Sequence, residues 1–151
     1  MKTLVLGIGN DILGDDGVGI HIARAIASRI DNSDVTVEET GAAGLSLLER
    51  IKGYERLIIA DAIFTHDTEV GKIHRLTLKD LAQTNDSVTP HEAALRTTLE
   101  IGNNLFPGEM PHDVVVFAVQ THDVDQVTGK MSKAVKAAVP EVVRMILAEI
   151  R

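Results

Sequence analysis

Two aspartates and one histidine come from segments that are far apart in the sequence but that could meet at one end of the folded chain. Asp16 follows the first apolar run within the segment LVLGIGNDILGDDGVG, Asp61 ends the run LIIAD, and His91 follows a Thr-Pro pair at the start of a helical pattern. Two carboxylates and an imidazole suit a divalent transition metal. We therefore predict a metal site formed by Asp16, Asp61 and His91.

The local setting of each residue supports this prediction. Asp61 comes after four apolar residues, where a carboxylate is costly unless it lies beyond the carboxyl end of the strand. That edge is the ligand crevice of an open parallel sheet. His91 would lie in the first turn of a helix, where the helix dipole disfavours imidazolium and keeps the ring neutral as a ligand or base. Asp15 is instead expected to cap the first helix or to be solvated.

The other histidines do not share the setting of His91. His122, at the end of the run VVVFAV, is kept as a reserve ligand because it would lie at the same edge of the sheet. His66 and His74 flank a weak strand and are expected to face solvent. The histidines expected to stay outside the site are His21, His66, His74 and His112.

A dinucleotide site at the first loop is an alternative that the sequence disfavours. Gly7 and Gly9 follow a strand, but the third glycine of the G-x-G-x-x-G pattern would fall at Ile12. The loop also carries carboxylates where a pyrophosphate would bind, and these repel an anion and attract a cation. The carboxylates are Asp11, Asp15 and Asp16.

The elements that would position these residues alternate between strand and helix patterns, which is typical of an α/β sheet covered on both faces. The runs LIIA and VVVFAV are apolar at consecutive positions, as in strands buried on both sides. A weaker strand over Lys72–Leu76 is expected at a sheet edge. The other predicted strands are Thr3–Leu6, Val35–Glu38, Leu57–Ala60 and Val114–Val119.

Four helices are predicted between and after these strands. The first carries an apolar stripe in steps of four from Val18, and the second begins near Gly44 and stops at Gly53. The third begins at the segment TPHE, with a threonine N-cap and proline at the first helical position. The last runs from about residue 132 to 150, and Pro140 should kink it.

Length and composition favour one domain spanning residues 1–151. There is no cysteine, so disulfides, thiolate metal sites and a cysteine nucleophile are excluded. The net charge of −7 argues against a nucleic-acid surface. The apolar runs are too short to cross a membrane, and no leader pattern is visible, so we expect a cytoplasmic protein.

The chain resembles the hydrogenase maturation endopeptidases. The resemblance rests on four collinear segments, LVLGIGNDILGDDGVG, ETGAAGLSLLE, LIIADAI and TPHEAAL, and extends over essentially the whole chain. It implies a three-layer α/β/α sandwich with a twisted, mostly parallel five-stranded sheet. It also implies that Asp16, Asp61 and His91 match the family's metal-binding residues, with Asp16 one methylene shorter than the glutamate of some members.

The resemblance implies an activity and a partner. Family members remove a short C-terminal extension from the large-subunit precursor of a nickel-iron hydrogenase after nickel has been inserted. Here Asp16, Asp61 and His91 would bind the nickel carried by the precursor and so position the scissile bond. The mechanism stays open between two options. The three residues could serve only to recognise the nickel and so place the scissile bond, or a carboxylate of the site could act as general base on a water polarised by the metal. A mechanism in which two aspartates share a proton, as in aspartic proteases, is a weaker option because it leaves His91 without a role.

Two other functions remain open at this stage. A nickel-binding chaperone or sensor could use the same three ligands without cutting, because ligand sets for binding and hydrolysis overlap. A general peptidase of related architecture could act on unrelated peptides.

Overall fold

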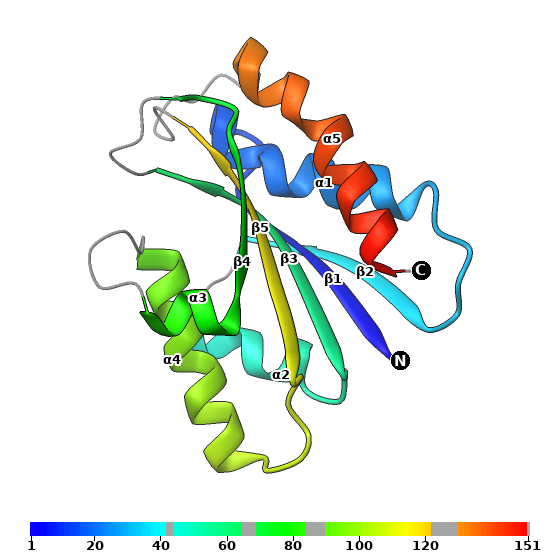
Figure 1. Ribbon diagram of the computed structural model, residues 1–151, viewed down its shortest axis with the longest axis vertical. Coiled ribbons are helices and arrows are strands. Elements are labelled where there is room, and N and C mark those ends of the chain that lie inside the picture. The colour runs from blue at the N-terminus through cyan, green and yellow to red at the C-terminus, as the bar shows by residue number, and fades with distance from the viewer. Residues whose placement is uncertain (42–43, 65–68, 84–89, 122–129, 151) are drawn as a thin grey trace.

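The protein folds as one sheet with helices on both of its faces (Figure 1). The computed structural model describes residues 1–41, 44–64, 69–83, 90–121 and 130–150, together with their side chains except those of 81–83 and 90–94. The strands in these ranges are β1 (Thr3–Ile8), β2 (Val35–Thr40), β3 (Arg56–Ile63), β4 (Ile73–Thr77) and β5 (Asp113–Gln120). The α-helices are α1 (Val18–Ala27), α2 (Leu48–Ile51), α3 (Leu78–Gln83), α4 (Pro90–Leu105) and α5 (Lys133–Ile150), and two 3₁₀ turns, η1 (Gly14–Gly17) and η2 (Gly44–Leu47), precede α1 and α2.

The strand order of the sheet is β2-β1-β3-β5-β4. All neighbouring strands are parallel except β4, which runs antiparallel to β5 at the edge. The central strands β1, β3 and β5 are buried almost throughout, as their continuous apolar runs predict for strands covered on both faces. The predicted edge position of the fourth strand is confirmed.

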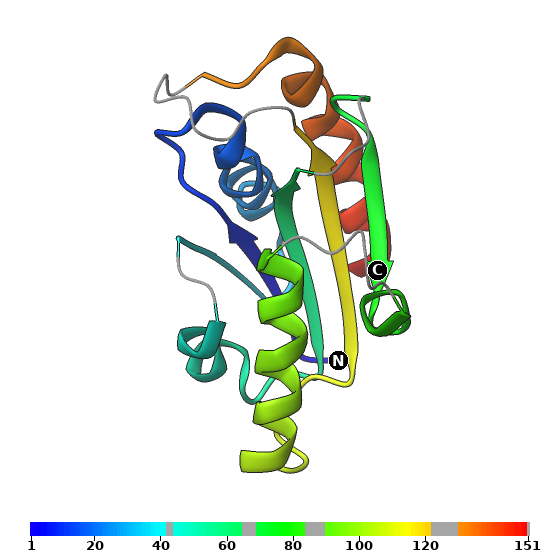
Figure 2. The same ribbon diagram turned by 90° about the vertical axis from the view of Figure 1, so that its left-hand side faces the viewer.

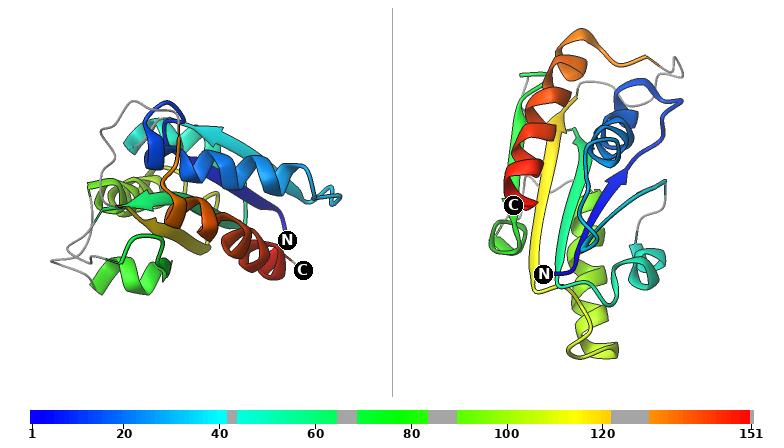
Figure 3. Two further views of the ribbon diagram at one scale, coloured as in Figure 1. Left: turned by 90° about the horizontal axis from the view of Figure 1, so that it is seen from above. Right: turned by 90° about the vertical axis from the view of Figure 1, so that its right-hand side faces the viewer.

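Two apolar clusters hold the layers together. On one face α1 and α5 pack on the sheet, and on the other α4, η2 and α2 pack on it (Figures 2 and 3). Alternate strand residues enter opposite clusters: Leu57 and Ile59 face α4, whereas Ile58 and Ala60 face α1 and α5. The predicted three-layer α/β/α fold is therefore confirmed.

Among the helices that the structure describes, none has the length and apolar character needed to cross a bilayer.

Four of the five predicted strands are shorter than the observed ones, and the fifth, β4, is shifted by one residue. β3 continues to Ile63, three residues past its predicted end, so Asp61 lies inside the strand and not beyond it. The apolar pattern marks only the apolar residues of a strand. It does not indicate whether the pairing of that strand with its neighbours continues past a carboxylate. β5 likewise extends to Gln120. The short helix α3 directly after β4 was not predicted.

The helix boundaries largely follow their sequence signals. α2 ends at Ile51, before the predicted stop at Gly53, and Pro90 is the first residue of α4 as expected. The proposed N-cap of α4, Thr89, lies outside the described residues. α5 is continuous through Pro140, which is exposed, so the missing N–H falls on the solvent side of the helix.

Candidate active site at the carboxyl edge of the sheet

Strands β1 and β3 are parallel neighbours, so their carboxyl ends lie at the same edge of the sheet. After β1 the chain folds back through η1, which contacts β3, before α1 begins. The approach of α1 to the sheet is close at Gly19, where an added Cβ would lie 2.3 Å from the carbonyl oxygen of Ala60. The absence of a side chain at Gly19 thus allows the start of α1 to sit directly against β3.

Asp16 lies in η1 and is partly exposed. Its Oδ2 accepts a hydrogen bond from the backbone N–H of Asn10 at 3.0 Å, which closes the turn. Gly9 has a φ of 154°, and a Cβ there would come within 2.1 Å of the backbone oxygen of Asp16. The position of Asp16 therefore depends on the glycine at position 9, directly after β1.

Asp15 does not cap the first helix, contrary to the expectation from sequence. Its carboxylate is buried and accepts two hydrogen bonds from Ser132, one from the backbone N–H at 2.6 Å and one from Oγ at 2.9 Å. The carbonyl of Ser132 in turn accepts from the N–H of Lys136, so Ser132 is the N-cap of α5. Asp15 thus joins the turn that carries Asp16 to the last helix. Residue spacing along the chain could not reveal that Ser132 is its partner.

Asp61 is only 4% exposed and alternates with Ile59 and Ile63, which face α4. Its side chain therefore lies on the α4 face of β3. Oδ1 accepts a hydrogen bond from the N–H of Ala62 at 2.8 Å. An aspartate buried between apolar neighbours is costly to maintain for stability alone, which favours a chemical role for Asp61.

His91 is the second residue of α4, and its side chain lies outside the described part of the structure. The N-terminal end of α4 points towards the carboxyl edge of the parallel strands (Figure 2). The reserve ligand His122 lies outside the described residues, as does His66. Among the residues with described side chains, no three acidic, histidine or cysteine groups are placed to hold a metal ion. The complete ligand set of Asp16, Asp61 and His91 thus stays a prediction.

His74 is only partly exposed, whereas the sequence pattern predicted that it would face solvent. It lies in β4, and its Nε2 is buried without a hydrogen-bond partner among the described residues. Only the pairing of β4 with β5 reveals this setting, because the weak alternation of the segment does not indicate which face is covered.

A cavity of about 320 Å³ lies beside the turn after β1, between the start of α1 and the end of β2. Arg24 bridges this region: its guanidinium contacts Glu39 at 2.9 and 3.0 Å and Asp11 at 3.3 Å. The hydrogen bonds to Arg24 lower the pKa of Glu39, and the same bonds raise the pKa of Arg24. The ion pairs link α1 to β2 and to the turn after β1.

Large apolar side chains are exposed at this edge of the sheet. They follow three adjacent parallel strands: Ile12 after β1, Leu45 after β2 and Phe64 after β3, each more than half exposed. Exposed apolar side chains at one edge of a sheet are compatible with a surface that binds a macromolecule.

The fold is that of an α/β/α protein with a mostly parallel sheet, a class in which ligands commonly bind at the carboxyl ends of the parallel strands. The family model of hydrogenase maturation protease matches residues 20–149. The chain belongs to the hydrogenase maturation protease family, whose members are peptidases.

Individual relatives agree with this assignment. Over the full chain, the sequence is 29% identical to the hydrogenase 2 maturation protease of Escherichia coli, of which it covers 92%. It is 25% identical to the hydrogenase expression/formation protein HupD of Rhizobium leguminosarum, with 99% of this chain and 74% of that protein covered. The solved structure of the hydrogenase maturating endopeptidase HybD from E. coli matches with a TM-score of 0.85 at 29% identity, covering 100% of this chain and 93% of that one.

Proposed function

We propose that this peptidase removes the C-terminal extension of a nickel-iron hydrogenase large-subunit precursor after nickel has been inserted. The observation that carries the proposal is the buried carboxylate of Asp61 at the carboxyl edge of the sheet, next to the turn that holds Asp16. Membership of the hydrogenase maturation protease family supports the same substrate. The exposed apolar residues around this edge support a protein-sized substrate.

In this proposal the precursor is recognised through the nickel that it carries. Asp16, Asp61 and His91 are its ligands, a set of two carboxylates and one imidazole that suits nickel. Asp16 and Asp61 come from neighbouring elements at one edge, and α4 directs its first turn towards that edge. A substrate without nickel would lack this anchor and would bind with its scissile bond out of position.

The same groups can take part in hydrolysis. Water adds to the carbonyl carbon of the scissile peptide bond and gives its proton to a carboxylate of the site, the C–N bond then breaks, and the proton passes to the departing amine. We propose Asp61 for this proton transfer because its burial favours a carboxylate with a chemical task. Asp16 and His91 then serve to hold the substrate.

The experiment compares three substrates at equal concentration: the nickel-loaded precursor, the nickel-free precursor and a free peptide that spans the cleavage junction. Intact mass spectrometry follows loss of the C-terminal extension. We expect cleavage of the loaded precursor alone. Cleavage of the free peptide would instead indicate a general peptidase, and tight binding of the loaded precursor without mass loss would indicate a nickel-binding chaperone or sensor.

A further inference from the structure

Two adjacent carboxylates of η1 point in different directions. Asp15 and Asp16 are successive residues of this turn, and successive residues of a 3₁₀ helix point about 120° apart. Asp16 is partly exposed and accepts a hydrogen bond from the N–H of Asn10. Asp15 is only 8% exposed and points to the start of α5. The candidate nickel ligand is therefore preceded directly by a buried carboxylate that the proposed hydrolysis does not use.

Both carboxylate oxygens of Asp15 are bound to one residue. Oδ1 accepts a hydrogen bond from the N–H of Ser132 at 2.6 Å, and Oδ2 accepts one from its Oγ at 2.9 Å. A carboxylate held through both oxygens cannot turn without losing a hydrogen bond. A serine at an N-cap needs no distant carboxylate, and a buried carboxylate is costly. Capping of α5 therefore does not explain this contact.

The packing of α5 makes Ser132 a fixed point. Val135, three residues further on, is fully buried in the apolar cluster that also contains Ala62 of β3. The first turn of α5 also lies against the segment before β4, because a Cβ at Gly71 would come within 2.7 Å of the carbonyl oxygen of Ala134. The start of α5 is thus held in place beside the turn that precedes α1 (Figure 3).

The hydrogen bonds that shape η1 are local. The N–H of Leu13 donates to the carbonyl of Asn10, and the N–H of Asp16 donates to the carbonyl of Leu13, each at 3.1 Å. Leu13, at the N-cap position of η1, makes no capping hydrogen bond with its side chain. The contact of Asp15 with Ser132 is what ties this short turn to α5.

A carboxylate that binds a metal depends on the groups that hold it in position. Loss of such a supporting group typically costs about 10- to 100-fold in metal affinity or activity. We propose that Asp15 is a positioning residue, which through Ser132 fixes η1 so that the carboxylate of Asp16 is oriented to bind the nickel of the precursor. This role rests on the proposed function of Asp16 as a nickel ligand.

The test compares Asp15→Ala with Asp15→Asn, which remove the same charge. Asparagine can still accept from the N–H of Ser132 and donate to its Oγ, whereas alanine can do neither. Isothermal titration with nickel(II) alone, at a temperature at which the variants are folded, should give a Kd about tenfold higher for Asp15→Ala and within about threefold of wild type for Asp15→Asn. An unchanged Kd in Asp15→Ala, or an equal rise in both variants, would overturn the proposal.

Two further variants separate position from stability. Ile146→Val thins the buried core under the far end of α5, so it should lower the melting temperature and leave the Kd unchanged. A rise in Kd as large as that of Asp15→Ala would overturn the proposal. If Asp15→Ala does not fold, Ser132→Ala keeps the charge and the backbone bond and should raise the Kd about two- to fivefold. An unchanged Kd there would equally overturn it.

The kinetics of the nickel-loaded precursor give an independent comparison. The value of kcat/KM should follow the same order, falling about tenfold in Asp15→Ala and staying within about threefold of wild type in Asp15→Asn. These values decide the question if the free protein binds no nickel. Equal values for wild type and Asp15→Ala would then overturn the proposal.

The backbone amide of Asn10 reports the position of Asp16 without nickel or precursor. Its ¹H resonance should shift in Asp15→Ala, because its bond to Oδ2 of Asp16 changes, and should stay near that of wild type in Asp15→Asn and Ile146→Val. An unchanged resonance in Asp15→Ala would overturn the positioning role alone. Wild-type protein that processes no nickel-loaded precursor would overturn the proposed function, whereas the Asn10 resonance would still show whether Asp15 positions Asp16.

Discussion

The carboxylate of Asp15 binds Ser132 through two hydrogen bonds, of 2.6 Å to the backbone N–H and 2.9 Å to Oγ, across 117 positions of the chain. One side chain thereby fixes both the turn that carries Asp16 and the start of α5. Ser132 precedes α5, which packs on the face of the sheet opposite α4, whereas Asp61 points to the α4 face.

Asp15→Ala should lower the free energy of unfolding by about 1–3 kcal/mol, because it leaves the N–H of Ser132 without its acceptor. Ser132→Ala keeps that N–H and should cost about 1 kcal/mol or less. Urea unfolding of both variants and of the double variant measures the coupling. Asp31→Ala, at an exposed carboxylate between α1 and β2, is the control and should have little effect. Equal stability of Asp15→Ala and Asp31→Ala would contradict the structural role of this contact.

Gly9→Ala should displace Asp16 and destabilise the protein by more than about 2 kcal/mol, because the new methyl group would lie 2.1 Å from the backbone oxygen of Asp16 and φ is 154°. Gly41→Ala is a matched control in the same region: its Cβ would meet the nearest atom, the carbonyl oxygen of Gly9, at 3.5 Å, an ordinary contact. Thermal melts of the two variants give the comparison. Similar melting temperatures would show that the turn can move without cost.

The sequence predicted those features that depend on local patterns. The apolar runs located the central strands, and the Thr-Pro pair located the start of α4, because both follow from the conformational preferences of a few adjacent residues. Asp16 and Asp61 were picked out because each follows an apolar run, although the strand end at Asp61 was placed too early.

The features that the sequence missed depend on which strands and helices become neighbours. The partner of Asp15 is 117 residues away, and the burial of the His74 Nε2 follows from the antiparallel pairing of β4 with β5. Neither relationship leaves a periodic signal in the chain. The ligand role of His91 stays a prediction, because it depends on a side chain outside the described part of the structure.

The ion pair between Arg24 and Glu39 predicts a pH dependence of stability. Arg24 lowers the pKa of Glu39 in the folded protein below its value in the unfolded chain. The pair therefore contributes stability above the unfolded pKa, and this contribution is lost as the pH falls through the folded pKa. Because both side chains are about half exposed, solvent screens the pair and we expect its contribution to stability to be small.

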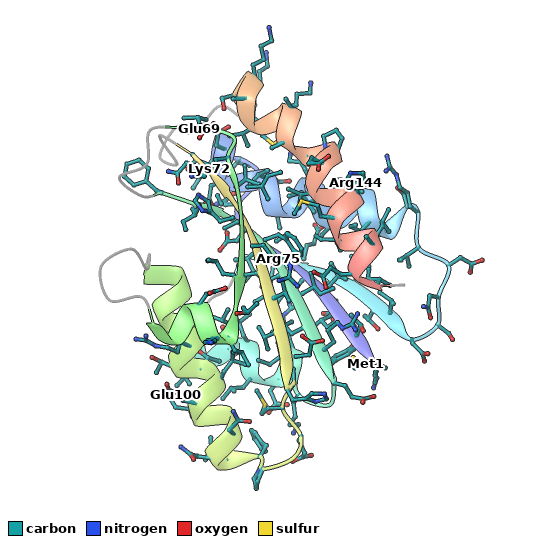
Figure 4. All side chains as sticks on the ribbon, viewed as in Figure 1. Met1, Glu69, Lys72, Arg75, Glu100 and Arg144 are labelled. Atoms are coloured by element: carbon teal, nitrogen blue, oxygen red, sulfur yellow. The ribbon has the colours of Figure 1, made fainter. Side chains whose placement is uncertain are left out.

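Urea unfolding between pH 7 and pH 3 tests this expectation. Glu39→Gln should be less stable than wild type at pH 7, and the two proteins should converge at pH 3. Glu100→Gln, at an exposed position on α4, should follow the wild-type curve throughout (Figure 4). A constant difference between Glu39→Gln and wild type over the whole range would exclude an electrostatic origin.

His91→Ala should weaken nickel binding by at least about tenfold while leaving the fold nearly intact, because Pro90 still starts α4. Isothermal titration with nickel at pH 7.5 and pH 6 measures the affinity, which should fall with pH as protons compete for the ligands. His112→Ala is the control for loss of a histidine elsewhere. If His91→Ala and His112→Ala bind nickel equally well, His91 is not a ligand and His122 becomes the next candidate.

Asp61→Asn should abolish processing without unfolding the protein. Asparagine keeps the shape of the side chain but cannot accept the proton from water or bind nickel as a carboxylate does, so we expect at least about a 100-fold loss of activity on the nickel-loaded precursor. The melting temperature should change by less than about 4 °C, because the neutral amide is less costly to bury than a charged carboxylate.

The matched control for Asp61→Asn is Asp113→Asn, which makes the same chemical change at the amino end of β5, on the opposite edge of the sheet. Asp113 forms a partly exposed ion pair with Arg56 at 3.1 Å, so its loss should lower stability slightly and leave activity unchanged. The comparison separates chemistry from charge, since both variants remove one negative charge from the same sheet. Full activity in Asp61→Asn would remove Asp61 from the catalytic mechanism, whereas a collapse of its melting temperature would make the buried carboxylate a structural group.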